Sequence, residues 1–166
     1  MRAFFKDYDF DLLTRLALGA ATTGCADVGE VFATIDGIKD GHGDQWVQAW
    51  SATASRLEHE AAARAAAGHR RSAAAAELRA AKYHEMASYA AYRVEGEDLF
   101  AEIWERYRAC FDRFCDLVAW PCEQVTIPYE DTTLPGYFWS AGEGRRRTLV
   151  MNNGSVIEQG NHEELL

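Results

Sequence analysis

The sequence predicts a mainly α-helical protein: a bundle of about five helices followed by a short, incomplete β-sheet. No proline occurs before Pro121, whereas Pro121, Pro128 and Pro135 follow in the last part of the chain. Because proline disrupts a helix interior, its absence permits long helices before residue 121. Beyond that point apolar residues alternate with a period of two, which is typical of strands. Hydrophobic residues make up 48% of the chain, which excludes a wholly disordered protein.

Five segments before Pro121 carry apolar residues at helical spacing. They span about residues 10–19, 27–41, 44–68, 72–90 and 97–117. The residues predicted to cap their N-termini are Asp27, Asp44 and Ser72. The predicted ends fall at Gly19, Gly41 and Gly68, because glycine adopts the left-handed conformation that often follows a helix.

Three short strands are predicted after Pro121, over about residues 123–129, 134–139 and 148–151. β-branched residues favour the first of them, and Pro128 gives it an edge position because proline cannot donate a ladder hydrogen bond. So few strands leave the sheet unfinished. The chain therefore divides into a helical domain at 1–120, a strand region at 121–155 and a tail at 156–166.

The charge of the chain disfavours nucleic acid and anionic membranes as partners. The formal net charge is −9 and the isoelectric point is about 5.0, so polyanions repel it. No apolar run approaches the roughly 18 residues that span a bilayer. The first residues carry acids where a signal peptide has an apolar stretch, so we expect a cytoplasmic protein. Its four cysteines, in no CxxC pair, are then expected to be reduced and mostly buried thiols.

No sequence motif predicts a metal, cofactor or catalytic site. The alternating acids Asp7, Asp9 and Asp11 lack the glycine and glutamate that complete a calcium loop. His59-Glu60 and His84-Glu85 are each half of a zinc-protease motif without its second histidine. The sequence contains no phosphate-binding loop, no GxGxxG and no GxSxG. We therefore predict no cofactor.

Trp46 and Trp50 lie four residues apart, on one face of the third predicted helix. Two interpretations stay open at this point. The pair can anchor the core of the bundle, or it can line an aromatic ligand pocket.

Taken in order, several segments resemble the α/β-hydrolases that carry an N-terminal helical cap, the group that includes 2,6-dihydroxypseudooxynicotine hydrolase and dipeptidyl aminopeptidase-like enzymes. The similar segments are GCADVGE at 24–30, WVQAW at 46–50, AGH at 67–69, RAAKY at 79–83, IPYE at 127–130, LPGYF at 134–138 and TLVMNNGS at 148–155. No single segment is specific, but their ordered set covers nearly the whole chain.

The resemblance implies that residues 1–120 form a cap and that 121–155 form the first strands of a hydrolase core. It makes Asn153 and Gly154 oxyanion-hole candidates, although an Asn-Gly pair also favours a plain turn. Candidate substrate-pocket residues are Trp46, Trp50, Tyr83 and Tyr89. The implied chemistry is hydrolysis by serine of an ester, amide or carbon–carbon bond in a small molecule. The family's nucleophile, acid and histidine all follow this segment, so we expect the chain alone to be inactive.

Two further interpretations concern the tail and the partners. Residues 149–166 resemble a segment of ABC-transporter ATPase domains, which points to a truncation, a fusion or an artificial junction, with His162 at a helix start. An alternative function is a stand-alone helical interaction module, because the Ala-rich helix pair loosely resembles a tetratricopeptide hairpin. Self-association through the open sheet edge is also left open.

Overall fold

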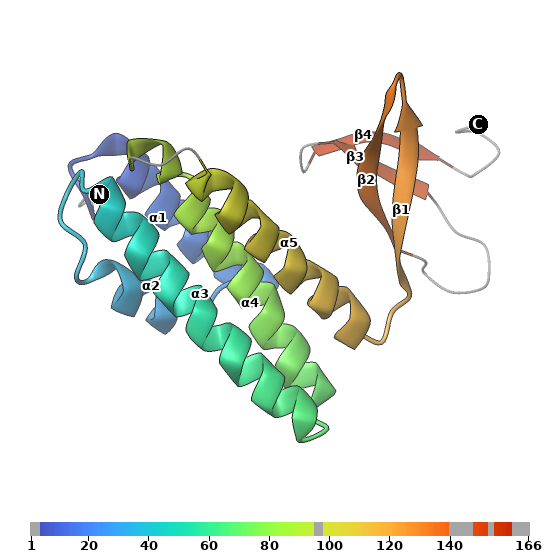
Figure 1. The fold of residues 1–166 in the computed structure, drawn as a ribbon, viewed down its shortest axis with the longest axis horizontal. Coiled ribbons are helices and arrows are strands. Elements are labelled where there is room, and N and C mark those ends of the chain that lie inside the picture. Colours follow the sequence, from blue (N-terminus) through green and yellow to red (C-terminus); the bar gives the residue numbers. More distant parts are fainter. Residues whose placement is uncertain (1–3, 95–97, 140–147, 153–154, 161–166) are drawn as a thin grey trace. The chain divides into compact units, whose positions relative to one another are not determined.

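The computed structural model describes residues 4–94, 98–139, 148–152 and 155–160 (Figure 1). The chain forms two compact units, residues 1–118 and residues 119–166. The first is helical and the second is made of strands, so the predicted fold class is confirmed. Among the described residues, no helix has the length and apolar character needed to cross a bilayer.

The described residues of the helical unit form five α-helices and two short 3₁₀ helices. In chain order these are α1 (Tyr8–Ala20), η1 (Ala21–Thr23), α2 (Val28–Ile35), α3 (Gly43–Ala66), α4 (Arg70–Ser88), η2 (Ala91–Arg93) and α5 (Leu99–Leu117). Helices α3 and α4 form a long hairpin, and α5 lies beside α4 (Figure 1). The shorter α1 and α2 pack at the end of the hairpin where α3 begins.

A row of aromatic rings runs through the core of this unit. Phe10 stacks on Trp46 with ring centroids 4.3 Å apart, and Trp46 contacts Trp50 at 5.5 Å. Trp50 in turn contacts Tyr83 of α4 at 5.4 Å. Around these rings α3 and α4 meet through small buried residues: Ala54, Ala61, Ala73, Ala76, Ala80 and Ala87. Alanines let the two helix backbones approach closely.

The helix boundaries show which sequence signals were correct. Asp27 caps α2 as predicted, since its side chain accepts a hydrogen bond from the N–H of Glu30 at 3.0 Å. The predictions for Asp44 and Ser72 are wrong, because α3 already begins at Gly43 and α4 at Arg70, so both residues lie in a first turn. Gly68 has a φ of 80° and ends the α3 region as predicted, so the chain reverses at once and α4 starts without a side-chain cap.

The predicted ends at Gly19 and Gly41 are also wrong. Helix α1 continues through Gly19 to Ala20, and the left-handed residue that follows is Gly24, with φ of 76°. Helix α2 stops at Ile35, and Gly41 lies in the loop before α3 with φ of 77°. A residue with φ in this range is most easily glycine, so both loops depend on it.

Two antiparallel strand pairs occur among the described residues of the strand unit. Strand β1 (Cys122–Tyr129) pairs antiparallel with β2 (Thr132–Trp139), and Pro128 lies opposite Thr133. Strand β3 (Thr148–Asn152) pairs antiparallel with β4 (Ser155–Gly160). The described residues thus hold four strands in two two-stranded sheets, where the sequence predicted three. Strand β4 was missed because its residues were assigned to the divergent tail.

The close contact between Gly43 and Arg93 gives a test of the packing. A Cβ at Gly43 would lie 2.5 Å from Arg93 Cβ, and Arg93 is held by hydrogen bonds to Asp7 and Asp9 at 2.6 Å each. We expect Gly43→Ala to lower the free energy of unfolding by about 1–3 kcal/mol in urea denaturation, because η2 must shift away from α3.

Gly37→Ala is the matched control, since a Cβ there meets nothing within 4 Å. Its effect should stay below about 1 kcal/mol. Equal destabilisation by the two substitutions would show that the contact with Arg93 is not the reason why a Cβ at residue 43 destabilises the fold.

Candidate functional site

The structure brings three of the four predicted pocket residues together inside the core. The side chains of Trp46, Trp50 and Tyr83 are fully buried, with 0% of their surface exposed. Tyr89, at the end of α4, is 44% exposed and donates a hydrogen bond to Glu85 at 2.8 Å. Their packing agrees with the core-anchor interpretation of the tryptophans, and a role in a substrate pocket stays a prediction. Asn153, Gly154 and His162 lie outside the described residues.

Tyr83 fastens α4 to the start of α2. Its hydroxyl accepts a hydrogen bond from the N–H of Asp27 and donates one to the carboxylate of Glu30, both at 2.9 Å. Arg79 also pairs with Glu30 at 3.0 Å. Burial, together with the nearby charge of Glu30, raises the pKa of Tyr83. The hydroxyl therefore stays protonated and acts as a neutral structural link.

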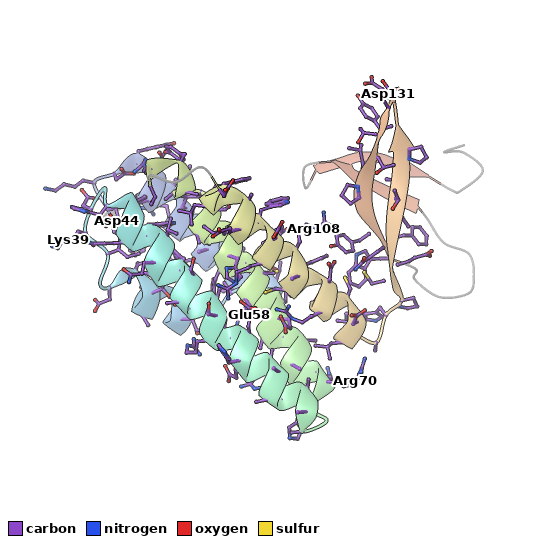
Figure 2. The ribbon with its side chains drawn as sticks, viewed as in Figure 1. Lys39, Asp44, Glu58, Arg70, Arg108 and Asp131 are labelled. Atoms are coloured by element: carbon purple, nitrogen blue, oxygen red, sulfur yellow. The ribbon has the colours of Figure 1, made fainter. Side chains whose placement is uncertain are left out.

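A second polar group, which we call the Glu58 cluster, lies where α3, α4 and α5 meet. It contains Glu58 of α3, Glu77 and His84 of α4, and Arg106, Cys110 and Arg113 of α5. Glu58, labelled on α3 in Figure 2, accepts hydrogen bonds from His84 Nε2 and Arg106 at 2.7 Å each. Its second oxygen accepts one from Arg113 at 3.1 Å.

Arg113 links the rest of the Glu58 cluster. Its guanidinium donates to Glu77 at 2.8 Å and lies 3.2 Å from the Cys110 sulfur. His84 and Cys110 are fully buried and Glu77 is 3% exposed, so these polar groups depend on one another for partners. Among the described residues, His84 Nδ1 and one oxygen of Glu77 have no hydrogen-bond partner.

Glu, His and Cys are also the residue types of metal sites and cysteine nucleophiles. Glu58, His84 and Cys110 offer ligand atoms that lie within 4.8 Å of one another. However, burial and the charge of Glu58 raise the pKa of Cys110 to about 12, so its thiol is protonated at neutral pH. The Arg113 guanidinium already contacts both Cys110 and Glu58, so a cation of the protein itself fills the role a metal would take. The arrangement is therefore suited to holding helices together.

The sequence analysis missed this cluster because its members are far apart in the chain. His84 and Glu58 are separated by 26 positions, and Arg113 and Glu58 by 55. From the sequence, His84 was considered only as part of an incomplete zinc-protease motif. One local pattern could have indicated the Glu58 cluster: charged residues recur at helical spacing between the apolar residues of α5.

The described residues of the helical unit line surface hollows. One, of about 530 Å³, is lined by Phe4, Phe5, Lys6, Phe32, Ile35, Asp36, Ile38 and Asp40. The carboxylate of Asp40 in this hollow already accepts hydrogen bonds from the N–H groups of Lys6 and Asp7. Another, of about 300 Å³, lies on α5 and is lined by Trp104, Glu105, Arg108, Ala109 and Asp112.

Comparison with known proteins relates the chain to hydrolases, although no protein-family model matches it. The hydrolyase ccsE of Aspergillus clavatus is 33% identical over 94% of this chain and 39% of its own length. The α/β hydrolase xenA of Xenoacremonium sinensis is 37% identical over 84% of this chain and 32% of its own length. The α/β hydrolase gkaG of Penicillium citrinum is 36% identical over 78% of this chain and 30% of its own length.

The chain is thus related to proteins named α/β hydrolases and spans only about a third of their length. The resemblance of its tail to an ABC-transporter ATPase finds no support in these relatives.

The ionisation of Glu58 predicts how stability depends on pH. Burial by itself would raise the pKa of Glu58, but the hydrogen bond from His84 and the charge of Arg106 outweigh it and lower the pKa to about 2. Since the ordinary value is 4.5, the charged form stabilises the fold above about pH 5, and this stabilisation is lost as the pH falls toward 2. We expect Glu58→Gln to lower the unfolding free energy at pH 7 by about 2–3 kcal/mol.

The difference between wild type and Glu58→Gln should shrink between pH 5 and pH 2 when unfolding is followed by circular dichroism. Glu105→Gln, at an exposed position of α5, is the matched control and should change stability little. A deficit of constant size across this pH range would contradict the assignment to the ionised carboxylate.

Proposed function

We propose that this chain is the N-terminal part of a serine hydrolase of the α/β-hydrolase type. Residues 1–120 are its helical cap, and residues 121–155 are the first strands of its catalytic core. The observation that carries the proposal is the extent of the matches, which take in 78–94% of the chain but 30–39% of each relative. A helical unit followed by strands is what a cap and the start of a core would give.

The reaction of the whole enzyme is hydrolysis of an ester, amide or carbon–carbon bond in a small molecule, through a nucleophilic serine. In this proposal the backbone around Asn153 and Gly154 supplies donors to the oxyanion, since N–H groups after a strand can be aimed at developing charge. Trp46, Trp50, Tyr83 and Tyr89 shape the cap side of the pocket. Trp46, Trp50 and Tyr83 are buried, so they would act by holding the helices in position. Tyr89 is exposed and could contact a ligand directly.

A stand-alone interaction module is the alternative, and one observation favours it. Phe100, Trp104 and Tyr92 are large apolar side chains that the helical unit leaves 43–73% exposed. Aromatic residues on a surface are common where proteins bind one another. The same residues also suit a cap that packs on a catalytic core.

The 166 residues by themselves should have no hydrolase activity. A nucleophilic serine needs a histidine base within about 3 Å and an acid behind it. Two serines of α3 and α4 are engaged with the helix backbone: Ser55 donates to the carbonyl of Ser51, and Ser88 to that of Glu85. Incubation with a fluorophosphonate probe and activated esters should give no more labelling than heat-denatured protein does.

Ser155 is the serine to exclude, because His162 follows seven residues later with three glutamates nearby. Stoichiometric labelling that disappears in Ser155→Ala would overturn the expected inactivity. Labelling that Ser155→Ala leaves unchanged would instead place a nucleophile elsewhere in the chain, which also contradicts it.

A further inference from the structure

We propose that the hollow between residues 4–6 and the end of α2 binds a zwitterionic aromatic molecule, of which a free aromatic amino acid is the simplest example. The hollow has a volume of about 530 Å³ and also includes residues of the loop that follows α2. This inference goes beyond the proposed function and does not rest on it. The candidate pocket residues Trp46, Trp50, Tyr83 and Tyr89 do not line this hollow.

Two phenylalanine rings give the hollow its apolar walls. Phe4 and Phe32 both line it, and their side chains are 41% and 46% exposed. The ring centroids lie 6.0 Å apart and the ring planes are tilted by 52°. Phe5 and Ile38 also line the hollow and are buried, so they extend its apolar surface inward. An aromatic ligand would cover apolar surface that the fold leaves open to water.

Hydrogen bonds hold the two sides of the hollow in place. Asp40, in the loop after α2, accepts hydrogen bonds from the N–H groups of Lys6 and Asp7 at 2.8 and 2.9 Å. The N–H of Phe4 donates to Asp11 of α1 at 2.7 Å. The first described residues are thus fixed against α1 and against the loop. A ligand would enter a site that is already formed, so it would pay little entropy for ordering the chain.

Two opposite charges at the hollow have no partner in the protein. Lys6 and Asp36 both line it and are exposed. Among the residues that the structure describes, neither the Lys6 ammonium nor the Asp36 carboxylate has a hydrogen-bond or ion-pair partner. The other carboxylate of the lining, that of Asp40, is already engaged by backbone N–H groups. Asp36 is therefore the acceptor, and Lys6 the donor, that a ligand would meet.

Size and charge together define the ligand class. Small-molecule sites have volumes of roughly 300–1,000 Å³, so a hollow of about 530 Å³ suits a molecule of amino-acid size. A ligand with one charge would pair with either Asp36 or Lys6 and leave the other beside a like charge. A ligand that carries both an ammonium and a carboxylate can pair with both residues, so the lining favours a zwitterion with an aromatic ring.

The test is a titration of the isotope-labelled 166-residue chain, followed through the chemical shifts of its backbone amides. The compounds are L-phenylalanine, L-phenylalaninamide, which lacks the carboxylate, and N-acetyl-L-phenylalanine, which lacks the ammonium. We expect L-phenylalanine to shift amides of residues 4–6 and 32–40 and to bind at least about threefold more tightly than either analogue, because each analogue loses one charged contact. The analogues also represent the two ends of a peptide, so they distinguish a peptide terminus from a free amino acid.

Variants assign each charged contact. Asp36→Asn should abolish the preference for L-phenylalanine over N-acetyl-L-phenylalanine, and Lys6→Gln should abolish the preference over L-phenylalaninamide. Lys39, labelled in Figure 2, is exposed in the loop after α2 but does not line the hollow. Lys39→Gln is therefore the matched control and should leave all three affinities unchanged. Phe32→Ala should weaken the binding of all three compounds, with circular dichroism as the check on folding.

Equal affinity for the three compounds would show that the hollow recognises only the ring, and tighter binding of one analogue would make it a site for a single charge. Either result overturns the inference, as do an absence of shifts at the hollow and an equal loss of binding in Lys39→Gln. Because the titration measures binding to this chain and not hydrolysis, each of these outcomes leaves the proposed function standing.

Discussion

The carboxylate of Glu58 is the point on which the packing of the three long helices depends. It lies on α3 and accepts hydrogen bonds from His84 of α4 and from two arginines of α5. A charge placed between helices is costly unless its partners are close and well oriented. Because one group must satisfy partners on both other helices, the rotation and register of all three are set together.

This constraint decides which aromatic residues face outward. With the Glu58 cluster on its inner side, α5 cannot turn Phe100 and Trp104 into the bundle without breaking the contacts of Arg106 and Arg113. The core is instead filled by the row from Phe10 through Trp46 and Trp50, closed by alanines between α3 and α4. The helical unit therefore has a complete interior and still displays an ordered aromatic surface.

The same packing gives the buried polar residues of the helical unit a structural role. Glu58, His84 and Cys110 have the side chains of a catalytic or metal site, but they are held by arginines, and the thiol stays protonated. The proposed function therefore rests on the relation to α/β hydrolases and not on this cluster. The polar groups inside the bundle hold the three long helices together, and the chain spans only about a third of the length of its relatives.

The sequence by itself determined the helical unit, the strands that follow it and the cap at Asp27. These features follow from periodicity, proline placement and capping, which act over a few neighbouring residues. Only the tertiary structure decided that Trp46, Trp50 and Tyr83 are core and that α5 leaves aromatic side chains exposed. It also decided the Glu58 cluster, whose partners are 26 to 55 positions apart. Burial and ion pairing depend on which helices meet, and that arrangement is a property of the whole packed chain.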